Sequence, residues 1–520
     1  MRTEPRVLAG VTLWRFGAVR RGIVGAATPR GIALGGAVVA LCLRLIGLSH
    51  PGHFGGITEY DDAVYFGTAI LITHGLLPYR DFVMVQPPGV PVLMIPVAYL
   101  ADLAGTRAAL ESTRVITCVV AALDVGLIGY ILRRQSRLAI SVAVLVAAVF
   151  PAFILASQTL LLEPYLDFFC LIGAAMLFSE QSLAASRTRI LLAGAAFGAA
   201  GAIKLWAVIP FAVLVVFYWR RSWREALYLA LGAGAAFAII CLPFLVAAPS
   251  RFVREVILDQ LGRSDIRVPI ATRLGYLGGS PSTLGASEIW LLALLVGAEG
   301  ALIVLPYLLN RRQPGPLETF AIVTAALIFV SMMIPADFYY HYGAFYAPFF
   351  AMALGLSADR WMKWSARPAL VKRIGATAVT AMVLACLFYV GFSSTPEVDP
   401  SVLVRSLVPK GACVLTDTAE ITLLSNRFLP IAKACPIIVD AFGTDLASGA
   451  EVAASANVDV SPRLEAFWMA AFHQAQYVVL SDNNVSRIPW TRPLVSYFEA
   501  HFQEIGSTGV AVFDRRRPKS

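Results

Sequence analysis

Charged residues are scarce in this sequence. Only 14% of the 520 residues are Asp, Glu, Lys or Arg, whereas soluble domains carry about a quarter, and 58% are hydrophobic. The apolar residues form long continuous runs, which excludes the alternating segments of about ten residues that are typical of a membrane β-barrel. The sequence therefore predicts an α-helical polytopic membrane protein.

Several signatures of other functions are also missing. The sequence contains no phosphate-binding glycine loop, no cluster of His, Cys and acidic residues with metal-ligand spacing, no internal repeat and no low-complexity tract. The basic amino-terminal segment 1–30 is not followed by a short apolar core with a cleavage site, so we expect the next apolar segment to be retained as an anchor. The net charge of +9 comes from basic residues beside apolar runs, where they report orientation rather than nucleic-acid binding.

The lengths of the apolar runs and the positions of the basic clusters predict the topology. A span needs about 20 apolar residues, and loops rich in Arg and Lys stay in the cytoplasm. Eleven spans fit between residues 31 and 392, with the amino end inside and the carboxyl end outside. The run that contains Lys204 has basic residues at both ends, so it must cross twice, with Lys204 near the outer turn of a helical hairpin. The other predicted spans are residues 31–48, 113–132, 138–155, 164–178, 226–246, 289–309, 317–334, a tenth span ending before Arg360, and 374–392.

A long outer loop, residues 49–111, separates the first two predicted spans. Its apolar part, Gly89 to Leu103, contains Pro91 and Pro96, which suits helices along the membrane surface better than a crossing. The alternative is a further span, which would reverse the orientation of everything downstream.

Residues 393–520 have the composition of a soluble domain. Strands are expected at 412–416, 437–439, 477–480 and 509–513, and helices at 419–426 and 462–473. This alternation predicts a small extracytoplasmic α/β domain. Its two cysteines, Cys413 and Cys435, would lie in an oxidising compartment and could form a disulfide, which the sequence alone leaves open.

Three carboxylates, Glu59, Asp61 and Asp62, follow the first predicted span directly. Carboxylates beside hydrocarbon are costly to desolvate and usually serve chemistry or ion handling. Thr58 and Asp61 have the spacing of a capping box, so a helix is expected to begin at Thr58, where the helix dipole favours negative charge in the first turn. Two interpretations remain: a cap with a solvated neighbour, or an ionised general base.

Five features in order along the chain resemble the GT-C superfamily of membrane glycosyltransferases. More narrowly, they resemble the branch of protein O-mannosyltransferases and lipid A aminoarabinose transferases. The resemblance covers residues 31 to about 355, and an extracytoplasmic carboxyl-terminal domain is usual in the family. The features are the acidic pair, the segment with PYRDF and QPPG, Glu163, GAAFGAAGAIK ending at Lys204, and FYYHYGAFYAPFF.

The resemblance implies a polyprenyl-phosphate monosaccharide donor that is used on the outer face. Asp61, which matches the first acid of the family's pair, would take the proton of the acceptor hydroxyl during an inverting displacement, while Asp62 and Glu59 would position the acceptor or share the proton. The leaving lipid phosphate needs cations, and Lys204 is the first candidate. The remaining candidates are Arg267 and Arg263 for the phosphate, and Glu163, Tyr340 and His341 for the sugar or acceptor.

Each of these residues also has an ordinary structural explanation. Lys204 could extend its side chain to the interface, the loop arginines could bind lipid headgroups, Glu163 could be a solvated turn residue, and the tyrosines near His341 could form an interfacial belt. No cofactor is certain. A divalent cation held by the three carboxylates is possible, although the branch named above generally uses none.

The composition, rich in Ala, Val, Gly and Arg, suggests a cell-envelope enzyme of the actinobacterial type in the plasma membrane. Mannose is the favoured sugar and arabinofuranose is next, with a glycan, glycolipid or protein as acceptor. Two other functions stay open: a flippase or transporter of polyprenyl-linked sugar, and a glycan ligase or polymerase that uses a diphosphate-linked donor. The paired broken helices of common transporter folds are not evident in the sequence.

Overall fold

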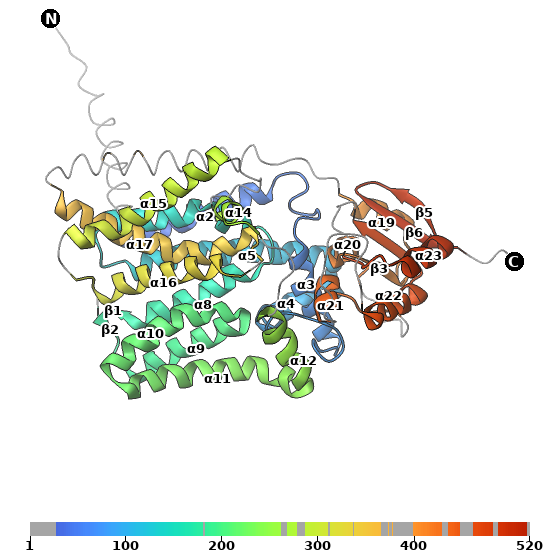
Figure 1. Cartoon of the computed structure of the whole chain (residues 1–520), viewed down its shortest axis with the longest axis horizontal. Coiled ribbons are helices and arrows are strands. Elements are labelled where there is room, and N and C mark those ends of the chain that lie inside the picture. The colour runs from blue at the N-terminus through green and yellow to red at the C-terminus, as the bar shows by residue number, and fades with distance from the viewer. Residues whose placement is uncertain are drawn as a thin grey trace, which may run out of the picture.

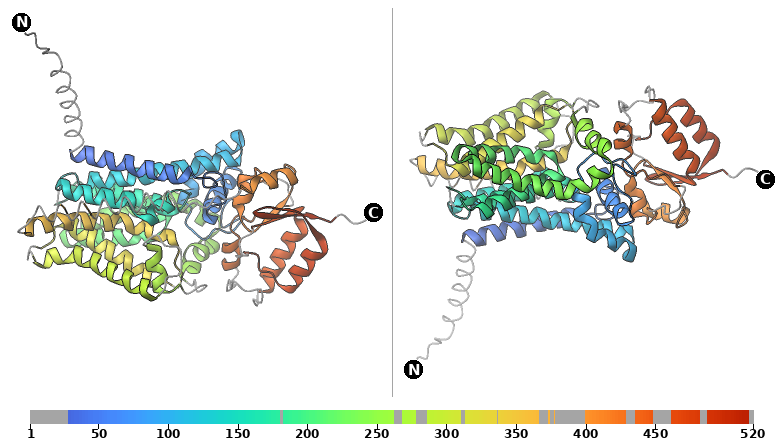
Figure 2. Two further views of the ribbon diagram at one scale, coloured as in Figure 1. Left: turned by 90° about the horizontal axis from the view of Figure 1, so that it is seen from above. Right: turned by 90° about the horizontal axis from the view of Figure 1, so that it is seen from below.

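A computed structural model describes residues 28–179, 182–261, 268–277, 286–309, 313–335, 337–365, 373, 377, 399–428, 435–447, 461–481 and 487–516. Figure 1 shows a helical part and an α/β domain that meets it at one end. The two views from above and below in Figure 2 place the domain at the same end. The predicted span 374–392 lies outside the described residues, apart from residue 377.

Most of the chain between residues 28 and 365 is helical, as its composition predicts. The helical elements are α2 (Pro29–Leu48), α3 (Tyr60–Thr73), α4 (Gly89–Ala104), α5 (Thr106–Ile131), α6 (Arg137–Val149), α7 (Pro151–Ala156), α8 (Leu162–Leu177), α9 (Arg187–Ile203), η1 (Leu205–Ala207), α10 (Val208–Arg221), α11 (Trp223–Ala247), α12 (Pro249–Val253), η2 (Arg254–Leu258), α13 (Asp259–Leu261), α14 (Ile270–Leu277), α15 (Ala286–Leu309), α16 (Pro316–Met333), η3 (Tyr340–Tyr342) and α17 (Gly343–Trp364). The short strands β1 (Phe178–Ser179) and β2 (Ser182–Leu183) pair between α8 and α9.

Four of the described helices are long and apolar enough to cross a membrane: α2, α5, α11 and α16. Several other predicted spans are shorter or broken in the structure. The predicted span 138–155 is divided into α6 and α7, because Phe150 is extended and Pro151, at the start of α7, has no N–H to continue the helical bonds of α6. The predicted turn at Lys204 is present, since Lys204 has an extended backbone between α9 and η1.

Helices α3 and α4 form the end of the helical part that faces the α/β domain (Figure 1). The predicted capping box at Thr58 is wrong, because α3 begins at Tyr60 and its N-cap, Glu59, makes no side-chain capping bond. The backbone N–H of Thr58 instead donates to Glu420 Oε1, 2.8 Å away in the α/β domain. A tertiary contact therefore replaces the local one.

The α/β domain is built on a four-stranded sheet of order β3-β4-β6-β5. β3 and β4 are parallel, whereas β6 pairs antiparallel with both β4 and β5. Trp468 and Phe472 fill its core between the helices and the sheet. Its elements are α19 (Ser401–Leu407), β3 (Val414–Thr416), α20 (Ala419–Leu424), α21 (Ala441–Ala447), α22 (Pro462–Gln474), β4 (Tyr477–Ser481), α23 (Arg492–His501), β5 (Phe502–Ser507) and β6 (Val510–Arg515).

The strand predicted at residues 437–439 is absent, and this segment is irregular in the structure. Ile437 and Val439 pack against the helical part, whereas Ile438 packs against the core of the α/β domain. Val439 is buried in the core of the helical part, and Ile437 packs against the same core. The β-branched pattern therefore marks a buried contact rather than a strand.

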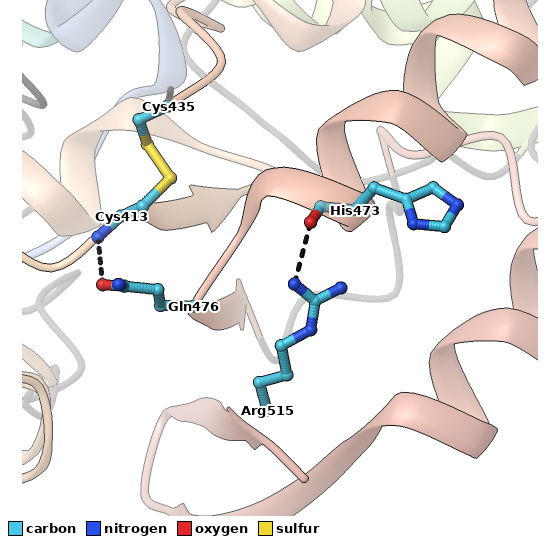
Figure 3. Close-up of a disulfide and its surroundings, with 5 residues drawn as sticks. All are labelled: Cys413, Cys435, His473, Gln476 and Arg515. Atoms are coloured by element: carbon cyan, nitrogen blue, oxygen red, sulfur yellow. Dashed lines mark hydrogen bonds between the residues drawn. A yellow bond between two sulfur atoms is a disulfide. The ribbon is translucent and has the colours of Figure 1, made fainter. Parts of the chain in front are cut away.

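Cys413 and Cys435 form a disulfide, with the sulfur atoms 2.03 Å apart (Figure 3). The backbone N–H of Cys413 donates to Gln476 Oε1 at 3.0 Å, and the main chain of Cys413 also accepts from Gln476 and Tyr477 beside β4. The bridge therefore fastens the irregular segment that follows Cys435 to the sheet. Asp440, at the end of that segment, reaches the helical part.

Candidate active site

The first turn of α3 presents two carboxylates towards residues of the helical part. The Glu59 carboxylate accepts a short hydrogen bond from the Tyr340 hydroxyl, although the two residues are 281 positions apart. Asp61 is half-buried, and its Oδ2 accepts from the Tyr65 hydroxyl at 3.1 Å, one turn further along α3. The other oxygen of Asp61 is not engaged by any hydrogen bond within the described residues. Asp61 therefore combines a fixed position with an available acceptor atom.

A buried carboxylate between two basic side chains lies beside this turn. Glu163, in the first turn of α8, is fully buried, and its Oε1 accepts from Lys204 Nζ at 2.6 Å. Its Oε2 lies 3.1 Å from His341 Nδ1. The Lys204 ammonium also lies 4.0 Å from the ring centre of Trp206 and 4.1 Å from that of Tyr342. These contacts hold the lysine in one place.

Tyr340 and His341 are neighbours in η3 and join the two groups of residues. Tyr340 contacts Glu59, whereas His341 contacts Glu163. Their rings meet edge to face with 5.5 Å between the ring centres. The late aromatic motif thus connects the acidic loop to the lysine, although the three segments are far apart in the sequence.

Asp62 is engaged in a buried ion pair instead. Its Oδ2 accepts from Arg114 Nε at 3.0 Å and from Arg114 Nη2 at 2.8 Å. The same Nη2 donates to Glu420 Oε1 at 2.7 Å, and Nη1 donates to the carbonyls of His53, Phe54 and Gly56. All three charged side chains are fully buried. Arg114 therefore connects α5, the acidic loop and the α/β domain.

The α/β domain also holds Tyr60, which lies between Glu59 and Asp61. The Tyr60 hydroxyl donates to Asp440 Oδ1 at 3.0 Å and accepts from the backbone N–H of Phe442 at 3.0 Å. The guanidinium of Arg487 lies 3.9 Å from the centre of the Tyr60 ring. One wall of the site is thus made by the α/β domain.

Burial and like charge shift the acidity of the groups around Asp61. Burial raises the pKa of Glu59, and the nearby Asp61 carboxylate raises it further. Burial also raises the pKa of Glu420, which shares one guanidinium with Asp62. For His341, burial alone would lower the pKa, but the adjacent Glu163 carboxylate more than offsets this, so the pKa is raised. A protonated His341 would add a second positive charge beside Lys204.

The structure thus brings together most residues that the sequence singled out. Glu59, Asp61, Glu163, Lys204, Tyr340 and His341 form one group, whereas Asp62 is separated from it by its ion pair with Arg114. Arg263 and Arg267 lie outside the described residues. Within the described ranges, no group of three or more His, Cys, Asp or Glu side chains is arranged to hold a metal ion.

Sequence reasoning missed Arg114, Glu420, Asp440 and Arg487. Arg114 carries a signal, because a charged residue at the start of a predicted span is costly unless it is paired. The three residues of the α/β domain give no comparable signal, since their partners lie more than 300 positions away or depend on how the domain docks.

Several solved structures share the fold of this chain. ArnT from Cupriavidus metallidurans matches with a TM-score of 0.60 and 15% sequence identity, over 92% of this chain and 96% of ArnT. The same protein bound to undecaprenyl phosphate matches with a TM-score of 0.58 and 15% identity, over 92% and 97% of the two chains. The archaeal oligosaccharyltransferase AglB from Archaeoglobus fulgidus, in complex with an inhibitory peptide and a dolichol-phosphate, gives 0.54 and 13%, over 94% of this chain and 74% of AglB. The fold is that of the GT-C membrane glycosyltransferases.

A comparison of the sequence with protein-family models also gives a match. Residues 85–335 match the model of glycosyltransferase family 87. No curated protein sequence matches the chain. The fold and the family match together support a GT-C-like membrane glycosyltransferase, which confirms the resemblance drawn from the sequence motifs.

Proposed function

We propose that this protein transfers a monosaccharide from a polyprenyl-phosphate donor to an acceptor hydroxyl on the outer face of the plasma membrane. Mannose is the favoured sugar and arabinofuranose the next, with a cell-envelope glycan, glycolipid or protein as acceptor. The observation that carries the proposal is that Tyr340 and His341 connect Glu59, two residues before Asp61, to the pair of Glu163 and Lys204. Bound undecaprenyl phosphate in ArnT and bound dolichol-phosphate in AglB support a lipid-phosphate donor.

The chemistry follows from the two halves of the site. Asp61 takes the proton of the acceptor hydroxyl while the acceptor oxygen forms a bond to the anomeric carbon. The bond between that carbon and the phosphate oxygen breaks, and the electron pair leaves with the lipid phosphate. Inversion results, and no covalent enzyme intermediate is needed. Because Lys204 is fixed before the reaction, its charge can stabilise the leaving phosphate without reorganisation.

The other residues have supporting roles in this proposal. Glu163 holds Lys204 and His341 in place, and two basic groups around one carboxylate leave a net positive charge for the phosphate when His341 is protonated. Glu59, through Tyr340, connects the acceptor side to the donor side. Asp62 acts on the orientation of the first turn through Arg114 rather than on the substrate. Arg267 and Arg263 remain proposed as further phosphate ligands.

The test uses the purified full-length protein in detergent, with labelled polyprenyl-phosphate mannose and polyprenyl-phosphate arabinofuranose offered in the presence of cell-envelope glycan. We expect Asp61→Asn to lower the rate of transfer about 100-fold or more, the usual contribution of a general base. Asp102→Asn is the matched control, because Asp102 lies on α4 with its side chain 45% exposed and, among the described residues, forms a charge pair only with His74, at 3.5 Å.

Transfer by Asp61→Asn at the wild-type rate would remove Asp61 as the base. Movement of intact sugar-lipid across vesicles, with no transfer to any acceptor by the wild-type protein, would favour a flippase instead. Transfer only from a diphosphate-linked donor would favour a ligase or polymerase.

A further inference from the structure

Arg487, which contacts Tyr60 from the α/β domain, is a charged residue whose donors remain available among the described residues. Among the described residues, its guanidinium makes no hydrogen bond and no ion pair, and its contact is the stacking on the Tyr60 ring at 3.9 Å. The Tyr60 ring cannot turn freely, because its hydroxyl is held by Asp440 and by the N–H of Phe442. The guanidinium is thus oriented while its five N–H donors are not used.

The position of Arg487 relative to Lys204 indicates which substrate it faces. Lys204 pairs with Glu163, whereas Arg487 stacks on Tyr60, the residue directly before Asp61. Arg487 therefore lies beside the residue next to Asp61, which is the proposed base for the acceptor hydroxyl. In a single inverting displacement, the attacking and leaving oxygens are on opposite faces of the sugar. If Lys204 receives the leaving phosphate, the side of the site with Asp61, Tyr60 and Arg487 receives the acceptor.

Resting on the proposed function, we propose that Arg487 binds an oxyanion, a phosphate or carboxylate group, of the acceptor. A planar guanidinium fork that is held on an aromatic ring suits such groups, because it can give two parallel hydrogen bonds. The acceptor is then an acidic glycan or glycolipid rather than a neutral one.

The carboxylates near Arg487 do not occupy it. Asp440 Oδ1 accepts from both Tyr60 and the N–H of Gly443. Asp417 is buried, and both of its oxygens accept from Ser481, at 3.0 Å from the N–H and 2.6 Å from the hydroxyl. These hydrogen bonds fix the two acids on the α/β domain, and neither forms an ion pair with Arg487. An anionic ligand therefore does not have to displace a bound carboxylate.

The test compares two competitors of transfer, methyl α-D-mannopyranoside and its 6-phosphate, in the purified full-length protein. We expect the 6-phosphate to inhibit the wild-type protein at a concentration at least about tenfold lower than that of the neutral sugar. The reason is that a hydrogen bond to a charged group is among the stronger ones. Arg487→Ala should remove this preference, and Arg487→Lys should keep part of it, since lysine retains the charge but not the fork. Arg492→Ala, at an exposed arginine of the same domain, should keep all of it.

The anion that Arg487 binds could belong to the acceptor or to the lipid phosphate of the donor. Direct binding of undecaprenyl phosphate distinguishes these two sources. Arg487→Ala should bind this lipid as the wild-type protein does. Weaker lipid binding by Arg487→Ala would overturn the assignment to the acceptor, and an unchanged preference for the 6-phosphate in Arg487→Ala would overturn the site. An equal response of the wild-type protein to the two competitors would overturn it as well. A wild-type protein that transfers no sugar at all would contradict the proposed function instead.

Discussion

Replacing Arg114 by methionine should destabilise the protein more than any comparable loss of a surface ion pair. Arg114 is fully buried, and its donors are shared among Asp62, Glu420 and three carbonyls of the acidic loop. Methionine leaves two carboxylates without their cation. Breaking a buried pair by removing one partner costs about 3–5 kcal/mol, and we expect a loss of this size in the free energy of unfolding.

The matched control is Arg107→Met, which lies two turns earlier on the same helix. Arg107 pairs with Glu111 and Asp399, but its side chain is 24% exposed, so we expect a cost of about 0–1 kcal/mol. Both variants can be compared by unfolding in mixed micelles with increasing SDS, followed by tryptophan fluorescence. Equal costs for the two variants would refute the reasoning from burial.

The double variant Arg114→Met with Asp62→Asn identifies the cause of the loss. If the cost comes from a stranded charge, removing one carboxylate should recover a measurable part of it. No recovery would mean that the guanidinium acts mainly through the carbonyls of His53, Phe54 and Gly56. Glu420→Gln alone should cost less than Arg114→Met, because the amide keeps an acceptor oxygen for Arg114 and Asp62 still balances its charge.

Two further predictions concern the donor site and the α/β domain. Lys204→Met should weaken binding of undecaprenyl phosphate to the purified protein about tenfold or more. Arg189→Met, at the exposed other end of α9, should leave this binding unchanged. Equal binding by the wild-type protein and both variants would remove Lys204 as a phosphate ligand. Burial raises the pKa of Asp445 to about 8, and Trp468 Nε1 donates to its Oδ1 at 2.9 Å. The folded state therefore holds a proton that the unfolded state releases, so this stability should be lost as the pH rises from about 4 through about 8. Asp445→Asn should flatten that dependence in unfolding curves read from tryptophan fluorescence, and an unchanged slope would contradict a neutral Asp445.

Local sequence patterns predicted which helices and strands exist better than they predicted where these elements end and what they contact. Lys204 could be placed at a turn because a lysine between two basic-ended apolar runs has no other position of low cost. The helix at 462–473 and the strand at 477–480 agree with α22 and β4 to within one residue at each end. In each case the apolar spacing and the breaking residues lie within the segment itself.

The failures arise where a distant segment replaces a local partner. The capping box at Thr58 does not form, since Glu420 takes its N–H from the other side of the site. Residues 437–439 have a strand-like pattern, but Ile437 and Val439 pack against the helical part. Candidate residues could be named from motifs, whereas the separation of Asp61 from Asp62 depended on the position of Arg114, which no local rule supplies.

The separation of the two aspartates follows from how the chain enters α3. Glu59 has an extended backbone, with φ of −153° and ψ of 125°, so side chains before the helix alternate between two sides. Thr58 and Tyr60 are held by Glu420 and Asp440 of the α/β domain, while Glu59 between them turns to Tyr340. In the first helical turn Asp62 is tied to Arg114 and thereby to Glu420, while Asp61 stays on α3 with Tyr65. The domain therefore holds the residues on either side of each carboxylate that faces the helical part. If Asp61 is the base, as proposed, it gains its fixed position from the α/β domain, which also carries Arg487.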